Sequence, residues 1–491
     1  MPKYVIAIDV GSTGTRTIAF SKNLEIVSKS YYELNQLYPK AGYVEQDPIQ
    51  IWELTFKSLK DVVNQIGINN IECIGITNQR ETIIAWDKED SKPIYNAINW
   101  QCRRSQDICY ELKEYENLIK QKTGLNLDPY FSATKIKWIL KEILKSKYNQ
   151  NKILFGTVDT WILWNLTKGK SYFTEPSNAS RTLLFNIHTI EYDSELLKIF
   201  NLNHIPLPEI KQSSSLFGYL DKSYFGKEVP ITGIIGDQQA SLLANEGFNQ
   251  DIIKNTYGTG LFVLTSIDKP IISKNLLTTI AWQINNKVSY ALEGSIFSGG
   301  NIIKYIRDQL KLIKTTAETE KIAKSLKSNE GVYFIPALSG LGAPNWNPYA
   351  KAVILGLTYK SDYKYIIRSA LEAIAYQTRD LIEIFKELLN KDFKELRADG
   401  GACVNNFLMQ FQADLLNMKI LRPKIIETTA LGAALTAAIY TNFWSIQEFT
   451  SNRKIDKIFY PSKNRTKFEN YYKEWKKALN FVNQFYKFNE S

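Results

Sequence analysis

The sequence predicts an α/β fold in two domains with a cleft between them. At 491 residues the chain is too long for one ordinary hydrophobic core. Its first half alternates strand-like and helix-like segments, and its second half repeats that order. Because each half opens on a glycine-rich turn, we expect a duplicated architecture. The boundary is predicted near residue 245, which gives domains 1–245 and 246–491.

The first half begins with a strand, a turn and two further strands. The corresponding runs are "YVIAIDV", "GSTGTR", "TIAF" and "EIVSKSYYEL". Asp47 and Pro48 then predict the N-cap and first position of a helix over 48–66, which the strand "IECIGIT" follows. Apolar residues recur at helical spacing, at Trp52, Phe56, Leu59, Val63 and Ile66, which predicts an amphipathic helix with these side chains on its core-facing side.

The second half shows the same style of alternation. "IKNTYGTGLFVLTSI" reads as strand, glycine turn and strand, and "FSGGNIIKYIRDQLKLI" reads as a helix opened by glycines. A long helix is predicted over 362–389, where apolar residues describe one buried face. "LRADGGACVNNFLMQFQADLL" is a further strand, glycine turn and helix.

The composition is typical of a globular enzyme, with 44% hydrophobic and 23% charged residues. No apolar run reaches the roughly 18–20 residues that a membrane helix needs. The start, "MPKYVIAIDV", is too short for a signal peptide and is typical of a first strand. We therefore expect a protein that is cytoplasmic and not membrane-embedded.

Cysteine, histidine and charge argue against several kinds of site. The four cysteines lack C-x-x-C spacing, which favours reduced thiols over a metal site or disulfides. Two histidines are too few for a multi-histidine metal centre, and they make a histidine-dependent triad improbable. The formal charge of +11 is spread along the chain without a basic cluster, which favours a solvated lysine-rich surface over nucleic-acid binding.

Three glycine turns have the composition of phosphate-binding loops. In "IDVGSTGTR", Asp9 ends a strand beside Gly11 to Thr15, and small residues allow backbone N–H groups to approach an anion. Asp9 could hold Mg²⁺, which prefers oxygen ligands. The other two turns are "NTYGTG", where Thr259 offers a hydroxyl, and "ADGGACVNN", where Gly400 and Gly401 are predicted to open a helix with a partly positive N-terminus. A plain hairpin or helix cap explains any one of them equally well, but three in one chain favour phosphate. The chain has no Walker-type G-x-x-x-x-G-K-[ST] motif.

Asp237 follows the apolar strand "PITGIIG", where a carboxylate either caps a helix or acts as a general base. Burial raises the pKa of such an Asp towards a useful value. In "NQRET", Arg80 and Glu81 supply a donor fork and an acceptor suited to the hydroxyls of a small polyol. Trp100 and Tyr130 could add an apolar wall and one more hydroxyl.

Together these segments resemble the FGGY family of carbohydrate kinases over essentially the whole chain. The matching pieces include "GITNQRET", "DPYFSATKIKWIL", "FGTVDTWILW", "SNASRTLLFNIHT", "GIIGDQQAS", "NTYGTG", "GLGAP", "DGGACVNNFLMQFQADLL" and "TALGAAL". "NQRET" combined with "GDQQA" is typical of the members that phosphorylate glycerol.

The resemblance implies two actin-like (ribonuclease H-like) domains, with ATP and Mg²⁺ in the cleft between them. It implies that Asp237 is the general base and that Asp9 and Asp237 lie near the metal. Glycerol would contact Arg80, Glu81, Trp100, Tyr130, Asp237, Gln238 and Phe262. ATP would contact Ser12, Thr13, Gly14, Arg16, Thr259, Gly300, Lys304, Gly401 and Asn405. A homodimer or homotetramer is also implied.

The chain departs from the family pattern at several positions. Val10 and Gly14 alter the first glycine turn, and Lys304 stands where a glutamine is common near the nucleotide. Asn345 and Asn347 replace the usual Tyr and Asp in "APNWNPYAKA". These changes bear on how phosphate and metal are placed and on the contact between domains.

Two alternative functions remain open at this point. One is phosphorylation of another small polyol or ketose by an enzyme of the same family. The other is a non-catalytic, actin-like nucleotide-binding protein, for which Val10 and Lys304 are the only support. Retention of Arg80, Glu81 and Asp237 argues against it, since a binding module needs no positioned base.

Overall fold

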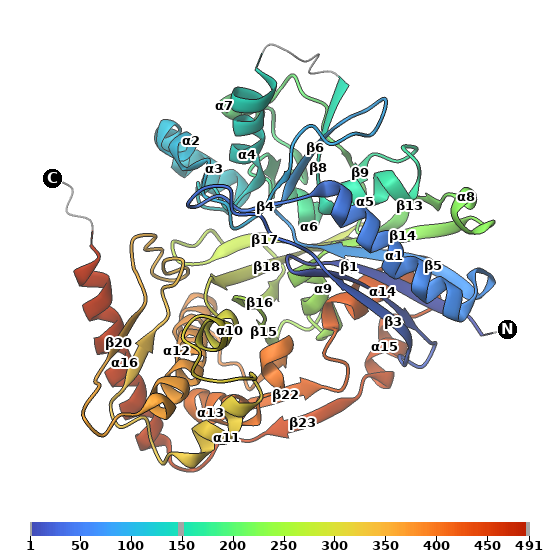
Figure 1. The fold of residues 1–491 in the computed structure, drawn as a ribbon. Coiled ribbons are helices and arrows are strands. Elements are labelled where there is room, and N and C mark those ends of the chain that lie inside the picture. The colour runs from blue at the N-terminus through green and yellow to red at the C-terminus, as the bar shows by residue number, and fades with distance from the viewer. Residues whose placement is uncertain (1, 146–151, 488–491) are drawn as a thin grey trace.

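The computed structural model describes residues 2–145 and 152–487, which form two large β-sheets with helices packed on their faces, and several smaller sheets. In Figure 1 the blue and green first half lies in the upper part of the molecule, and the yellow to red second half lies below it. Orange and red segments from the end of the chain return to the underside of the first sheet. The predicted α/β class is confirmed.

The larger sheet of the first half consists of β1 (Tyr4–Val10), β2 (Gly14–Phe20), β3 (Ile26–Glu33), β5 (Ile71–Asn78), β13 (Ser214–Leu220) and β14 (Val229–Gly236). Its order is β13-β14-β5-β1-β2-β3. The neighbours β14, β5 and β1 run parallel, and the outer strands join antiparallel. Since helices cover both faces, the central strands are almost continuously apolar.

The sheet of the second half consists of β15 (Ile253–Tyr257), β16 (Leu261–Ile267), β17 (Leu277–Ile284), β18 (Lys287–Ile296), β21 (Glu395–Asp399), β22 (Lys419–Pro423) and β23 (Ile455–Phe459). Its order is β17-β18-β16-β15-β21-β22-β23, again with three parallel strands, β15, β21 and β22, between antiparallel neighbours. The matching order and directions agree with the duplication expected from the glycine turns.

Shorter strands complete the β structure of the described residues. They are β4 (Glu45–Gln46), β6 (Ile83–Asp87), β7 (Ala97–Ile98), β8 (Ile153–Thr157), β9 (Phe173–Thr174), β10 (Phe185–Asn186), β11 (Glu191–Tyr192), β12 (Glu209–Ile210), β19 (Tyr333–Ile335) and β20 (Val353–Leu355). The α-helices of the first half are α1 (Pro48–Ile66), α2 (Gln106–Glu111), α3 (Glu116–Thr123), α4 (Ser132–Trp138), α5 (Val158–Leu166), α6 (Pro176–Ala179), α7 (Ser194–Phe200), α8 (Lys222–Phe225) and α9 (Asp237–Ala244). Those of the second half are α10 (Asn301–Asp308), α11 (Glu318–Ser325), α12 (Tyr363–Leu389), α13 (Asn406–Leu416), α14 (Thr428–Tyr440), α15 (Ile446–Asn452) and α16 (Arg465–Phe485).

Helix α1 has the predicted bounds and the predicted cap. The side chain of Asp47 accepts a hydrogen bond from the N–H of Ile49 at 2.8 Å, and Pro48 is the first helical residue. The predicted buried face was only partly right, because Trp52 and Phe56 are half-buried. These two rings pack against Tyr224 of α8, at the rim of the core that α1 forms with the first sheet.

Helices α9 and α14 lie between the two sheets. Helix α14 packs on β1, β5 and β14 of the first sheet, and α9 contacts both α14 and β16 of the second sheet. Glycines allow this close packing: a Cβ added to Gly75 would lie 2.2 Å from the carbonyl oxygen of Ala433, and one added to Gly432 would lie 1.9 Å from that of Ala240. The catalytic candidate Asp237 begins α9, so this packing determines where its carboxylate lies.

The third glycine turn differs from its prediction. Gly400 and Gly401 do not open the α-helix directly, because a short 3₁₀ turn over Gly401–Val404 comes first. Asn405 then caps α13 by accepting a hydrogen bond from the N–H of Leu408. Gly400 has a φ of +82°, and a Cβ there would lie 2.8 Å from the backbone of Tyr257, so only glycine suits this position.

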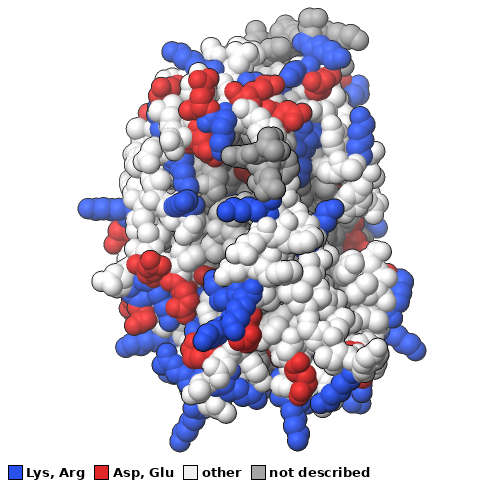
Figure 2. Space-filling model, turned by 90° about the vertical axis from the view of Figure 1, so that its left-hand side faces the viewer, with Lys and Arg blue, Asp and Glu red and all other residues white. Residues whose placement is uncertain are grey.

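The surface mixes charges of both signs. On the face shown in Figure 2, Lys and Arg side chains are interspersed with Asp and Glu. The four cysteines are buried and unpaired. Among the described helices, none combines the length and the apolar composition that crossing a bilayer requires.

Candidate active site

A small cavity lies where the two halves of the chain meet. Its volume is about 140 Å³, below the roughly 300–1,000 Å³ of pockets for drug-sized ligands, so it suits a small molecule. It is lined by Ser12, Thr13, Gln79, Arg80, Glu81, Trp100, Tyr130, Asp237, Gln238, Thr256, Gly258, Thr259, Gly260 and Phe262. Residues from two of the three glycine turns thus lie beside the predicted polyol contacts.

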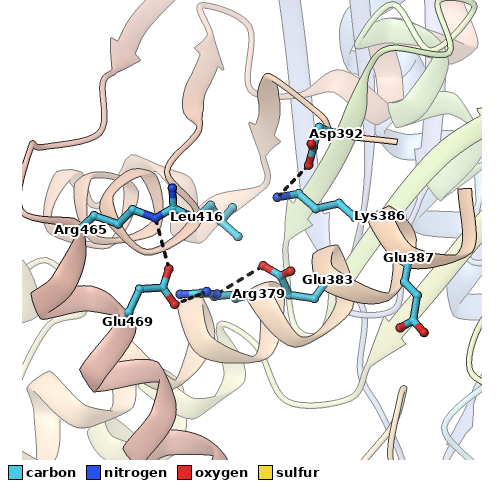
Figure 3. Close-up of a pocket in the computed structure, with 8 residues that line it drawn as sticks. All are labelled: Arg379, Glu383, Lys386, Glu387, Asp392, Leu416, Arg465 and Glu469. Carbon is cyan, nitrogen blue, oxygen red and sulfur yellow. Dashed lines mark hydrogen bonds and ion pairs between the residues drawn. The ribbon is translucent and has the colours of Figure 1, made fainter. Parts of the chain in front are cut away.

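A larger hollow of about 630 Å³ lies elsewhere, between α12 and α16 (Figure 3). Each of its cations, Arg379, Lys386 and Arg465, lies beside a carboxylate of the same lining. Arg379 bonds to Glu469 at 2.7 Å and lies 3.5 Å from Glu383, while Lys386 lies 3.7 Å from Asp392. Because neighbouring charges already satisfy these cations, this hollow offers no site comparable to the cavity between the halves.

Arg80 lies in the loop that joins β5 to β6, and its side chain is 2% exposed. Glu293 of β18 receives hydrogen bonds from both terminal nitrogens of Arg80, at 2.5 and 2.9 Å. The remaining nitrogen, Nε, lies 3.3 Å from Oδ1 of Asp237. Two carboxylates from different parts of the chain therefore hold the guanidinium at the cavity wall.

Glu81 and Tyr130 are held in place by two buried cations. Nε of Arg181 donates to Oε1 of Glu81 at 2.6 Å. Nζ of Lys135 donates to the carbonyl oxygens of Glu81 and Tyr130, at 3.1 and 2.5 Å. Burial lowers the pKa of Lys135 to about 8. These bonds connect the loop after β5 to the start of α4.

Three aromatic rings form the apolar side of the cavity. The ring centroid of Trp100 lies 5.5 Å from that of Tyr130 and 6.2 Å from that of Phe262. The indole N–H of Trp100 donates to Oγ of Ser12 at 2.6 Å, which joins this wall to the first glycine turn. The cavity therefore presents carbon-packing surfaces opposite charged hydroxyl-binding groups.

Asp237 is the one carboxylate of the cavity that remains partly open to solvent, with 25% of its side chain exposed. Its Oδ1 accepts the N–H of Gln238 at 2.7 Å. Burial raises its pKa to about 6, against the opposing effect of the Arg80 guanidinium. The upward shift expected from the sequence is confirmed. Gln238 in turn accepts a hydrogen bond from the buried Lys254 at 2.8 Å.

The second glycine turn, which lines the cavity, lies against the glycines that precede α10 and beside the third turn. The N–H of Gly300 donates to the carbonyl of Gly258 at 2.8 Å, and that of Gly299 donates to Thr259 at 2.9 Å. A Cβ added to Gly300 would lie 3.7 Å from Cβ of Ala402, so the third turn is adjacent. These hydrogen bonds hold the second turn in place, and its small residues leave room for a polyphosphate.

Asp9 is the second-to-last residue of β1, just before the first glycine turn, and it is buried. Burial raises its pKa to about 6, and Nε of Arg16 lies 3.5 Å away, the one ionic partner recorded for this carboxylate among the described residues. Arg16 also pairs with Glu427. The substitution at Gly14 has a steric explanation, since a Cβ there would lie 2.3 Å from the Tyr31 hydroxyl.

Seven predicted site residues lie outside the cavity lining: Asp9, Gly14, Arg16, Gly300, Lys304, Gly401 and Asn405. Lys304 is exposed on α10, and Asn405 uses its side chain to cap α13 and to bond to Thr319. The departures at Asn345 and Asn347 serve a contact with α16, because both side chains hydrogen-bond to Asn483.

Sequence reasoning missed several residues of the site. Gln79 lies in the quoted "NQRE" run, and Gly258 and Gly260 lie in a quoted turn, so their motifs gave a signal. The sequence signal for Glu293 was weaker, because Glu293 is a single charge in the otherwise strand-like run "SYALEGSI". Arg181 lies in the quoted run "SNASRTLLFNIHT", but nothing in the sequence indicates which carboxylates it meets.

Two family descriptions match the chain. The FGGY family of carbohydrate kinases, N-terminal domain, matches residues 4–244, and the C-terminal domain of the same family matches residues 253–441.

Individual relatives match along nearly the whole chain. Glycerol kinase of Aquifex aeolicus is 56% identical over 480 residues, covering 97% of this chain and 98% of the relative. Glycerol kinase 2 of Thermotoga maritima is 49% identical over 486 residues, with coverage of 97% and 98%. Among solved structures, Plasmodium falciparum glycerol kinase with ADP has a TM-score of 0.88 and 35% identity, covering 98% of both chains. A xylulose kinase of Lactobacillus acidophilus, at 23% identity and a TM-score of 0.85 over 97% of this chain and 98% of that one, shares the fold.

Proposed function

The chain belongs to the FGGY family of carbohydrate kinases, and we propose that it transfers the γ-phosphoryl group of ATP to a terminal hydroxyl of glycerol. The products are ADP and glycerol 3-phosphate. One observation carries the proposal: a cavity of about 140 Å³ joins Arg80, Glu81 and Asp237 to the glycine turn around Thr259.

Glycerol recognition combines hydrogen bonds with packing on carbon. Arg80 donates to substrate hydroxyls and Glu81 accepts from them, while Gln238 lines the same wall. The rings of Trp100, Tyr130 and Phe262 pack against the three-carbon skeleton. The small volume of the cavity favours such a short substrate over a ketose.

Asp237 acts as the general base. Its carboxylate takes the proton from the terminal hydroxyl as that oxygen forms a bond to the γ-phosphorus, and the bond from phosphorus to the β-bridging oxygen breaks. ADP leaves on the opposite side, so the displacement is in line. The position of Asp237 at the start of α9, between the polyol contacts and the glycine turns, supports this role.

ATP lies along the converging glycine turns. The proposed contacts are Ser12, Thr13, Gly14, Arg16, Thr259, Gly300, Lys304, Gly401 and Asn405. Support comes from the hydrogen bond that joins the second turn, at Gly258, to Gly300 at the start of α10. The exposed side chain of Lys304 and the capping role of Asn405 place these two at the outer edge of such a site.

The residues present fit a Mg²⁺ ion, since Asp9 is a buried carboxylate whose recorded ionic partner among the described residues is Arg16 alone, at 3.5 Å, and Asp237 offers a second set of oxygens. When bound with ATP, the ion neutralises charge on the phosphates. Asp9 and Asp237 would hold it. No group of three or more His, Cys, Asp or Glu side chains suited to a metal occurs among the described residues, which agrees with an ion held mainly by phosphate and water.

We further propose that residues 1–245 and 246–491 are lobes that close on the bound substrates. Closure excludes water and so suppresses wasteful hydrolysis of ATP. A cytoplasmic location is supported by the four buried free thiols. A homodimer or homotetramer remains a prediction.

The proposed function is tested by ADP release from MgATP with glycerol, dihydroxyacetone, D-xylulose or no acceptor. We expect glycerol to give the highest kcat/KM and glycerol 3-phosphate to be the product. Release without an acceptor should be far slower, because the closed site lacks a nucleophile. Preference for D-xylulose would refute the assignment of the polyol pocket, and equal release in all four samples would refute the kinase reaction itself.

Activity should depend on pH through Asp237. Only the ionised carboxylate accepts a proton, and burial raises its pKa to about 6, so the active fraction falls as pH drops through that value. We expect kcat/KM for glycerol to be level above about pH 7 and to fall about tenfold per unit well below about pH 6. Initial rates measured with dilute glycerol, together with circular dichroism at each pH, test this. An acid limb near the ordinary Asp pKa of about 4 would contradict it.

A further inference from the structure

Two buried charges contact the polyol-binding residues but do not line the cavity. Arg181, just after α6, and Glu293, on β18, each have side chains that are 0% exposed. Burying a charge is costly unless it is paired and hydrogen-bonded, so these side chains depend on the groups around them.

The two charges close a ring with Arg80 and Glu81. Oε1 and Oε2 of Glu293 accept from the terminal nitrogens of Arg80 at 2.9 and 2.5 Å. Nη2 of Arg181 donates to the same Glu293 at 3.1 Å, and Nε of Arg181 donates to Glu81 at 2.6 Å. Nε of Arg80 lies 3.7 Å from Glu81, which completes an alternation of two cations and two anions.

The ring spans the two halves of the chain. Glu293 comes from the second half, where it pairs across the sheet with Leu264 of β16 and accepts the hydroxyl of Ser295 at 2.7 Å. Arg181 comes from the first half, with its guanidinium 5.1 Å from the ring centroid of Phe131. Both are therefore fixed by secondary structure and packing before any substrate arrives.

Arg80 has three carboxylates within reach, and their distances differ. Those of Glu293 and Asp237 lie 2.5 and 3.3 Å away, and that of Glu81 lies 3.7 Å away. If Glu293 lost its charge, the guanidinium would be drawn towards the other two. The guanidinium would then pair with Glu81, which must bind a hydroxyl, and with Asp237, which must accept the proton.

We propose that Glu293 and Arg181 are positioning residues for the polyol: Glu293 holds Arg80 and Arg181 holds Glu81, so that both side chains keep the places at the cavity wall from which they bind the substrate. This assignment rests on the proposed glycerol kinase reaction. It adds to that reaction a pair of buried charges that never touch the substrate.

The test compares steady-state kinetics of the full-length wild type with those of Glu293→Gln. We expect kcat/KM for glycerol to fall between about tenfold and about a hundredfold, with most of the loss in KM for glycerol. KM for MgATP should stay within about twofold, because the hydrogen bonds of the Glu293 carboxylate to described residues go to Arg80, Arg181 and Ser295 and not to the glycine turns. Glu293→Asp, which keeps the charge on a shorter side chain, should lose less.

Glu372→Gln is the matched control. Glu372 is an equally buried carboxylate on α12, paired with Arg368 at 2.7 Å and remote from the cavity lining. A merely structural loss lowers the amount of active enzyme, and hence kcat, without raising KM for glycerol. The control should show only that effect.

Arg181→Lys provides a second variant that keeps its charge, should Glu293→Gln fail to fold. A lysine lacks the planar fork that reaches Glu81 and Glu293 together, so KM for glycerol should again rise. An unchanged KM for glycerol in Arg181→Lys and in whichever Glu293 variants fold would overturn the assignment and leave the proposed function intact. A wild type without glycerol-dependent ADP release would overturn both.

Discussion

Replacing Asp237 by asparagine should reduce kcat for glycerol phosphorylation by about two to four decades, the range expected when a general base is lost. The amide cannot take the hydroxyl proton, while Arg80, Glu81 and the aromatic wall still bind the polyol. Glycerol binding, measured by isothermal titration calorimetry in the presence of ADP, should therefore persist. Steady-state ADP release provides kcat.

Asp380→Asn serves as the control for this change. Asp380 is a buried carboxylate of α12 that accepts hydrogen bonds from Tyr472 and Trp475, outside the cavity lining. Its substitution should lower stability and leave kcat per folded molecule unchanged. A residual activity of Asp237→Asn within about tenfold of wild type would show that another group, or none, acts as the base.

Replacing Gly432 by alanine should destabilise the protein, although the same change inside an exposed helix usually stabilises it by about 1 kcal/mol. The added Cβ would lie 1.9 Å from the carbonyl oxygen of Ala240, so α14 and α9 must move apart. Overpacking of this kind costs about 1–3 kcal/mol. Because α9 begins at Asp237, kcat for glycerol should fall as well.

Thermal unfolding and kinetics on the same preparation measure both effects of Gly432→Ala. Ser451→Ala, at an exposed position of α15, changes helix propensity without a steric conflict and should leave both quantities nearly unchanged. A higher unfolding midpoint for Gly432→Ala, with full activity, would contradict the close packing of α14 against α9.

Local sequence signals predicted the elements that are determined by interactions between residues close together in the chain. Asp47 followed by Pro48 specifies the start of α1, since a capping side chain and a fixed φ act within one turn. The glycine turns were recognisable because small residues are needed wherever backbone approaches backbone. The run around Arg80 and Glu81 was recognisable for a different reason: charged side chains between two apolar strands require a partner or a ligand.

Local sequence signals did not predict features that depend on residues far away in the chain. The sequence predicts buried rings at Trp52 and Phe56, yet only the docking of α8 shows that they lie at a rim. Likewise, α14 reads as a small, apolar helix of the second half, and its packing on the first sheet depends on Gly75, more than 350 positions earlier in the chain. Hydrophobic periodicity indicates which face of a helix is buried. It does not indicate which element packs on that face.

The sequence alone was enough to predict the α/β class and the glycine turns. It was also enough to select Asp237, Arg80 and Glu81 as site candidates. The tertiary structure alone shows that Glu293 pairs with Arg80 and Arg181 pairs with Glu81. It also shows that one small cavity unites the three candidates with residues of two glycine turns. The reason is physical: propensity, capping and turn chemistry act over a few residues. The field at a buried carboxylate depends on charges brought close by folding, from any position in the chain.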